Sequence, residues 1–230
     1  CSALPSISPP PPRESNLMEA TRIIAIRHGE TAWNVDTRIQ GQLDIPLNDT
    51  GRWQAHQLAL ALAGEPITAI YASDLWRAYD TALSVAGAVG LNITTSEGLR
   101  ERGFGSFQGR TFADIEAELP EQALRWRKRD PEFAPEGGES LNDFRDRVLA
   151  CIHALAARHP GELITVVAHG GVMDVLYRAA TGQGLQAPRT WDLGNAAINR
   201  LLWTPEGFTL VGWADTYHLE QQGALDENAA

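Results

Sequence analysis

Two short stretches of the sequence each place a histidine directly after an apolar run. The run at residues 23–26 is followed by Arg27 and His28, and the run at residues 163–168 is followed by His169. An apolar, β-branched run of this length is typical of a strand that is buried on both faces. We therefore expect both imidazoles just beyond the carboxyl ends of buried strands, where open α/β sheets bind their ligands.

Two more residues with useful chemistry follow predicted strands. Arg77 lies in the first turn of the helix after a strand at residues 67–71, and Glu101 lies in the loop after a strand at residues 92–95. Strands separated by helices form a parallel sheet, because right-handed crossovers return each strand in the same direction. One edge of the sheet should therefore gather five residues: Arg27, His28, Arg77, Glu101 and His169.

This set of side chains favours phosphoryl transfer through a histidine nucleophile over metal chemistry. The two arginines would neutralise phosphoryl oxygens and lower the pKa of His28, which keeps its imidazole neutral and nucleophilic. Glu101 would supply the proton to the leaving oxygen. A zinc site on His28 and His169 would need a third protein ligand, and the flanking arginines oppose a dication.

Composition excludes several other functions. The 19 basic and 29 acidic residues give a formal charge of −10, which disfavours nucleic-acid binding through phosphate neutralisation. Lys128 is the sole lysine and has no glycine loop or strand before it, so Walker-type phosphate loops, protein-kinase sites and pyridoxal enzymes are excluded. No apolar window is long enough to span a membrane. Cys1 and Cys151 build no disulfide framework, which favours a reduced, cytoplasmic setting.

The chain divides into three parts. Residues 1–19 are proline-rich and are predicted to form a disordered arm, either an upstream extension with Met18 as an alternative start or the tether of a processed lipoprotein. Residues 20–217 are expected to form a single domain, in which residues 111–137 make a polar, proline-broken cover segment. Residues 218–230 carry no pattern and are predicted to be a loose tail.

Within the domain, strands alternate with helices. Asn48 is expected to cap a helix that ends near residue 64, Ser73 or Asp74 a helix that runs to about Gly90, and Ser140 an amphipathic helix. A further helix is predicted from about residue 172 to 181, and an edge hairpin at residues 197–203 and 208–213. The fold class is therefore three-layer α/β/α, with a mostly parallel central sheet, helices on both faces and a C-terminal edge hairpin.

Five motifs occur in a fixed order between about residues 21 and 215, and together they are highly specific. They are Arg27-His28-Gly29-Glu30-Thr31-x-x-Asn34, Ser73-Asp74-Leu75-x-Arg77-Ala78, Leu99-Arg100-Glu101-Arg102, Gly138-Glu139-Ser140 and Ala168-His169-Gly170-Gly171. In this order they resemble the histidine phosphatase superfamily, also called phosphoglycerate mutase-like, and the resemblance implies that family's fold.

The resemblance also implies roles. His28 becomes phosphorylated, and Glu101 is the proton donor and later the base for water. The phosphoryl group is held by Arg27, Asn34, Arg77 and His169. Gln40 and Gly41 match a loop that touches the substrate in relatives, although Gln40 departs from the threonine of the mutases, and Gly170 is placed with these substrate-binding residues. The resemblance implies no metal or organic cofactor.

Within the family, the sequence favours a hydrolase over a mutase. Glu101 and His169 are 68 positions apart, whereas cofactor-dependent mutases carry a longer insertion there, and Thr31 stands where mutases usually have serine. The expected activity is hydrolysis of a small phosphorylated metabolite. The alternatives are a phosphoglycerate mutase-type phosphoryl transferase and a catalytically silent relative that binds phosphorylated ligands. No nucleic-acid or membrane partner is expected, and the oligomeric state stays open, with a homodimer as one option.

Overall fold

A six-stranded sheet, in the strand order β3-β2-β4-β1-β5-β6, forms the centre of the computed structural model, which describes residues 19–223. The strands are β1 Thr21–Arg27, β2 Ile67–Ala72, β3 Ile93–Thr95, β4 Leu163–Ala168, β5 Ile198–Thr204 and β6 Gly207–Asp215. The first four strands pair in parallel, β5 runs antiparallel to β1, and β6 runs antiparallel to β5. The prediction of a mostly parallel sheet with an edge hairpin is confirmed.

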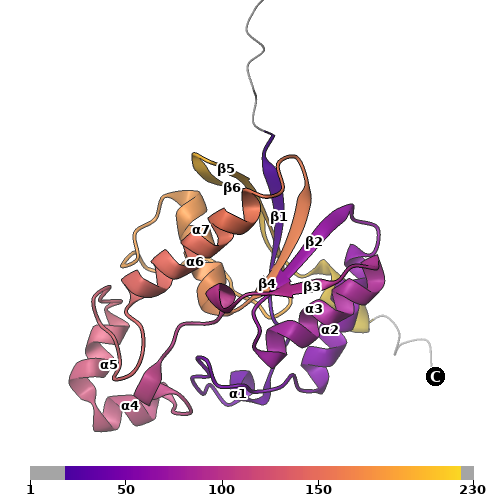
Figure 1. Ribbon diagram of the computed structural model, residues 1–230. Coiled ribbons are helices and arrows are strands. Elements are labelled where there is room, and N and C mark those ends of the chain that lie inside the picture. The colour runs from indigo at the N-terminus through magenta and orange to yellow at the C-terminus, as the bar shows by residue number, and fades with distance from the viewer. Residues whose placement is uncertain (1–18, 224–230) are drawn as a thin grey trace, which may run out of the picture.

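Helices cover both faces of this sheet. The main helices are α2 Asp49–Leu62, α3 Trp76–Val89, α6 Leu141–Ala156 and α7 Gly170–Thr181. In Figure 1, α2 and α3 lie on one side of the sheet, and α6 and α7 lie on the other. The arrangement confirms the predicted three layers.

Strand β1 shows why the apolar runs do not alternate between apolar and polar residues. Successive side chains of a strand point to opposite faces. Ile23 and Ala25 belong to the core under α6 and α7, whereas Ile24 and Ile26 belong to the core under α2 and α3. All six residues of β4 are likewise buried. Both faces must therefore be apolar, because each is covered by helices.

Helix starts agree with the sequence in two cases and differ in two. The side chains of Asn48 and Ser140 cap α2 and α6 as predicted. Helix α3 begins one residue after Leu75, without a side-chain cap, because the carboxylate of Asp74 pairs with Arg100 instead. Helix α7 begins at Gly170 rather than at residue 172, so that His169 occupies its N-cap position.

The cover segment folds as two short helices, α4 Phe112–Glu118 and α5 Pro120–Arg127. They share a small separate core with neighbouring loops, made of Phe107, Ile115, Ala123 and Phe133. In Figure 1, α4 and α5 stand beside α6 and away from the sheet. Pro120 occupies the first turn of α5, where a backbone N–H would have no partner within the helix, so its absence in proline costs no hydrogen bond.

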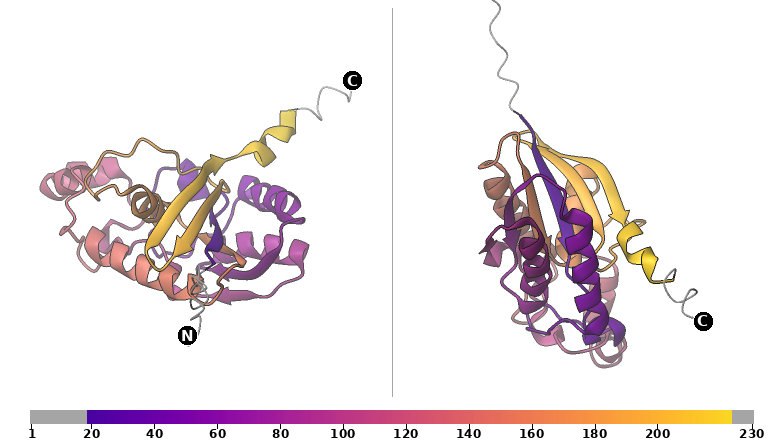
Figure 2. Two further views of the ribbon diagram at one scale, coloured as in Figure 1. Left: turned by 90° about the horizontal axis from the view of Figure 1, so that it is seen from above. Right: turned by 90° about the vertical axis from the view of Figure 1, so that its right-hand side faces the viewer.

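The C-terminal hairpin of β5 and β6 lies at one edge of the sheet and leads into a short 3₁₀ helix, Tyr217–Gly223 (Figure 2). Nε2 of His218 lies 3.1 Å from the carbonyl oxygen of Ala196, and Leu219 packs on the core under α2 and α3. The predicted loose tail is therefore wrong for its first residues, which pack against the domain. The predicted arm up to residue 18 and the tail from residue 224 lie outside the described residues.

None of the helices within residues 19–223 is long and apolar enough to cross a membrane.

Candidate active site

The strand order brings the two histidine motifs together. Because β4 pairs directly with β1, Arg27 lies opposite Ala168, and the backbone N–H of His28 donates to the carbonyl oxygen of Ala168 at 2.9 Å. The imidazole rings of His28 and His169 then lie 5.2 Å apart between centroids, edge to face. Both side chains are buried.

One hydrogen bond sets the tautomer of His28. Its Nδ1 lies 2.7 Å from the carbonyl oxygen of Gly29, which can only accept, so Nδ1 carries the proton. Nε2 keeps its lone pair and accepts a hydrogen bond from Nε of Arg77 at 3.3 Å. The ring therefore presents an unprotonated nitrogen to a guanidinium group, as a nucleophile directed at an anionic ligand requires.

Arg77 is fully buried and holds the loop that contains Gly41 and Leu43. Its Nη1 and Nη2 donate to the carbonyl oxygens of Leu43 and Gly41 at 2.8 and 2.7 Å. Burial lowers the pKa of Arg77 to about 10, so the guanidinium stays charged at neutral pH. Gly41 has a φ of +53°, and a Cβ there would lie 2.2 Å from Oε1 of Gln108, so glycine is required at this turn.

Both imidazoles are neutral at neutral pH. Burial lowers the pKa of His28 well below its ordinary value, and the positive charges of Arg77 and Arg27 lower it further. Burial and the Arg77 charge lower the pKa of His169 in the same way. Neither ring nitrogen of His169 has a hydrogen-bond partner within residues 19–223, although both are buried. A buried polar group left unpaired is costly, which indicates that a ligand completes this site.

Arg27 also has an unused donor. One of its terminal nitrogens donates to the carbonyl oxygen of Leu193, whereas its Nε is buried without a partner. Burial is the main cause that lowers its pKa, and the negative charge of Glu101 opposes this effect.

The carboxylate of Glu101 is held at the amino end of α7. Its Oε2 accepts from the backbone N–H of Gly171 at 2.9 Å, and its Oε1 accepts from that of Arg102 at 2.8 Å. Two backbone donors fix the carboxylate near the arginines and imidazoles. It is thus positioned to exchange a proton with a ligand held there.

Eight of the nine predicted site residues line one cavity of about 470 Å³: Arg27, His28, Asn34, Gln40, Gly41, Arg77, Glu101 and Gly170. The ninth, His169, is not among the lining residues, but its ring packs edge to face against the ring of His28. Arg38, Ile39 and Phe104 complete the lining. The sequence offered Phe104 as a pocket or a core residue, but it did not indicate Arg38 and Ile39.

Asn34 belongs to a four-residue helix, α1 Ala32–Val35, that was not predicted. Its Oδ1 accepts from the backbone N–H and the hydroxyl of Thr31 at 3.0 and 3.1 Å. The amide oxygen is therefore engaged locally, and the amide group is fixed beside the cavity. Gln40 is buried, and its Oε1 has no partner among the described residues.

Two residues that support the site were missed by sequence reasoning. Arg147 of α6 donates to the carbonyl oxygens of Arg100 and Glu101 at 3.1 and 3.2 Å and pairs with Glu139 at 2.7 Å, so it fixes the loop that carries Glu101. Asn195 donates to the carbonyl oxygen of His28 at 2.9 Å. The Gly138-Glu139-Ser140 motif marks the neighbourhood, but nothing in the sequence distinguishes Arg147 from Arg145, the other arginine of its helix.

Gly171 offers a direct test of the Glu101 position. A Cβ at residue 171 would lie 2.2 Å from Oε1 of Glu101, so Gly171→Ala must displace the carboxylate. We expect kcat to fall about 100-fold, which is the lower range for loss of a general acid. Gly87→Ala in α3 is the matched control, because nothing lies within 4 Å of the added methyl group. Wild-type turnover in Gly171→Ala would show that the carboxylate position is not needed.

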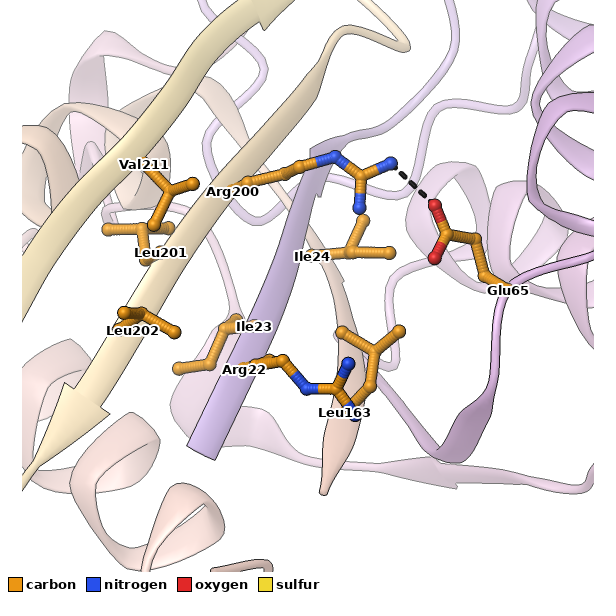
Figure 3. A pocket seen from close by; sticks show the side chains of 9 residues that line it. All are labelled: Arg22, Ile23, Ile24, Glu65, Leu163, Arg200, Leu201, Leu202 and Val211. Carbon is orange, nitrogen blue, oxygen red and sulfur yellow. Dashed lines mark hydrogen bonds and ion pairs between the residues drawn. The ribbon is translucent and has the colours of Figure 1, made fainter. Parts of the chain in front are cut away.

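A separate cavity of about 390 Å³ lies at the amino ends of β1 and β4 (Figure 3). Its lining is mostly aliphatic, and its ion pair joins Arg200 to Glu65 at 2.7 Å. It holds no histidine and is remote from the motifs. Within residues 19–223, no group of three His, Cys, Asp or Glu side chains is arranged to hold a metal ion.

An arginine-lined cavity with neutral, buried imidazoles at the carboxyl edge of an α/β sheet is the class of site that suits a phosphoryl group. The sequence model of the histidine phosphatase superfamily (branch 1) matches residues 23–216. The chain belongs to this superfamily and is a histidine phosphatase.

Individual relatives agree with this assignment. Phosphoglycerate mutase-like protein 4 of Arabidopsis thaliana is 37% identical over 217 residues, which cover 92% of this chain and 93% of that protein. Metal-independent phosphoserine phosphatase of the same plant is 37% identical over 90% of this chain and 87% of its own length. The structure of a mycobacterial glucosyl-3-phosphoglycerate phosphatase in complex with VO3 superposes with a TM-score of 0.75 at 35% identity, covering 85% of this chain and 99% of that one.

Proposed function

We propose that the chain hydrolyses a small phosphate monoester in two steps through a phosphohistidine on His28. In the first step, Nε2 of His28 forms a bond to phosphorus while the bond to the ester oxygen breaks, and Glu101 gives its proton to the departing oxygen. In the second step, Glu101 accepts a proton from water as the water oxygen bonds to phosphorus. The nitrogen–phosphorus bond breaks, and inorganic phosphate and free His28 result.

The observation that carries this proposal is the orientation of His28. The hydrogen bond from Nδ1 to Gly29 leaves Nε2 unprotonated, and its lone pair accepts from Nε of Arg77 at 3.3 Å, a donor that a phosphoryl oxygen can take over. A positive charge about 4 Å from a phosphoryl oxygen is worth about 4 kcal/mol at an effective dielectric constant of about 20. The arginines thus favour the anionic group that the lone pair attacks.

Unpaired donors support the assignment of phosphoryl contacts. The buried Nε of Arg27 and the ring nitrogens of His169 have no partners within the described residues. We assign Arg27, Asn34, Arg77 and His169 to the phosphoryl oxygens. The part of the same cavity that we assign to the rest of the substrate is lined by Gln40, Gly41 and Gly170.

A hydrolase is favoured over a mutase by the short cover segment. A mutase must exclude water from its phosphohistidine and retain a bisphosphate intermediate, which a small cover does less well. Relatives named for phosphoserine and glucosyl-3-phosphoglycerate phosphatase activity support a small phosphorylated metabolite as the substrate.

A panel of phosphoesters tests this function, with release of inorganic phosphate as the readout. The panel includes 3-phosphoglycerate with and without 2,3-bisphosphoglycerate. We expect phosphate release that does not depend on the bisphosphate. Interconversion of 3- and 2-phosphoglycerate that requires the bisphosphate and releases no phosphate would establish a mutase. Saturable binding without turnover of any ester would establish a silent phospholigand-binding relative.

A further inference from the structure

A cavity other than that of Figure 3 adjoins the active-site cavity on the side of Glu101, and we call it the second cavity. It measures about 800 Å³, and Glu101 and Phe104 line both cavities. If Glu101 protonates the departing oxygen, as the proposed function requires, the organic part of the substrate must extend past Glu101. The second cavity is therefore where the leaving group lies, an inference that rests on the proposed function.

One part of this cavity wall is apolar. Phe104 and Trp126 pack with ring centroids 5.5 Å apart, and Leu141, Phe144 and Val175 add aliphatic and aromatic surface. Trp126 belongs to α5 of the cover segment, whereas Val175 belongs to α7. The cover segment thus supplies part of the wall that contacts the leaving group.

The rest of the wall carries an excess of positive charge. Arg129 donates to Oδ2 of Asp174 at 2.7 Å and to the carbonyl oxygen of Leu185 at 2.6 Å. The same Asp174 oxygen also accepts from Arg178 at 3.0 Å. Arg102 donates to two carbonyl oxygens instead of a carboxylate. The lining thus holds three guanidinium groups and two carboxylates, those of Glu101 and Asp174, although the chain as a whole carries a net charge of −10.

Arg189 is the guanidinium left for a ligand. It is exposed, and it forms no hydrogen bond or ion pair with any residue in the part of the chain that the structure describes. It lines the second cavity and also a third one that contains Arg27 and Gly170. Burial lowers the pKa of both Arg27 and Arg129, and the positive charge of Arg189 lowers both further, so its charge acts on both of these groups.

We propose that the second cavity binds a leaving group that carries a second anionic group, a carboxylate or a second phosphate, and that Arg189 selects it. The apolar wall of Phe104 and Trp126 contacts the carbon skeleton, and Arg189 pairs with the anion. Arginine suits either anion because its planar donors bind both in a bidentate manner. A phosphoester with a neutral leaving group lacks this contact and is the poorer substrate.

Matched substrate pairs test this proposal in the wild-type enzyme and in Arg189→Gln. 3-Phosphoglycerate and glycerol 3-phosphate differ in one carboxylate, and fructose 1,6-bisphosphate and fructose 6-phosphate differ in one phosphate. We expect the wild type to prefer the anionic member of at least one pair, and Arg189→Gln to lower kcat/KM for that member about tenfold, as the loss of a charge-assisted contact should. For the member with the neutral leaving group, the kcat/KM of Arg189→Gln should stay within about twofold of the wild-type value, because no charge-assisted contact is lost there.

Arg22→Gln is the matched control, because it removes the same charge at the opposite end of β1, beside the cavity of Figure 3. If Arg189→Gln loses the preference for 3-phosphoglycerate, the anion is a carboxylate. If it loses the preference for fructose 1,6-bisphosphate, the anion is a phosphate. An unchanged preference, or an equal loss in Arg22→Gln, would overturn the role of Arg189 and leave the hydrolase intact. If the wild type released phosphate from neither member of either pair, nor from any ester of the panel, the proposed function itself would fail.

Discussion

His28→Ala is expected to lower kcat by more than about 10⁴-fold, because it removes the nucleophile of the proposed mechanism. His169 is assigned to holding the phosphoryl oxygens and not to the attack on phosphorus, so it is not expected to replace His28. The arginines of the cavity remain, so the variant should still bind inorganic phosphate. Steady-state phosphate release together with phosphate binding by calorimetry measures both effects.

His56→Ala is the control for this substitution, because it removes an exposed histidine on α2. It should retain wild-type turnover, and thermal unfolding of both variants shows whether each is folded. Turnover in a folded His28→Ala protein at the wild-type rate would refute the assignment of the nucleophile.

Glu101→Gln is expected to lower kcat for alkyl phosphates by about 10²- to 10⁴-fold. The amide keeps the size of the carboxylate but cannot give a proton to the departing oxygen. An aryl ester such as p-nitrophenyl phosphate leaves without protonation, so its first step should be far less affected. The second step still lacks its base, and phosphoenzyme should therefore accumulate with this substrate.

Burst kinetics with p-nitrophenyl phosphate separates these two steps. Glu206→Gln in the turn between β5 and β6 is the control, because this exposed side chain is remote from the cavity. An equal loss for alkyl and aryl esters, without a burst, would mean that Glu101 acts on binding or structure and not on proton transfer.

The catalytic edge of the sheet was largely predictable because its signals are local. The apolar runs before Arg27 and His169 mark β1 and β4, and their double-sided burial follows from the absence of polar alternation. Parallel strands share an edge, so these motifs had to lie on the same side. That β4 pairs directly with β1 depends on the order of the strands, which local periodicity does not encode.

Other features depend on contacts between residues that are distant in the sequence. Helix α1 spans four residues, too few for a helical period to show. Asp74 pairs with Arg100 rather than capping α3, and His218 contacts Ala196, choices that only the folded chain determines. Arg147 matters because it reaches the carbonyl oxygens around Glu101 across the fold.

The most direct test of the account is a rapid-quench experiment with a ³²P-labelled substrate. The account predicts a transient phosphoenzyme whose label is stable in base and labile in acid, and which maps to the peptide that contains His28. The label should be absent from His28→Ala. A label on another residue, or single-turnover phosphate release at the full rate without any labelled intermediate, would contradict it.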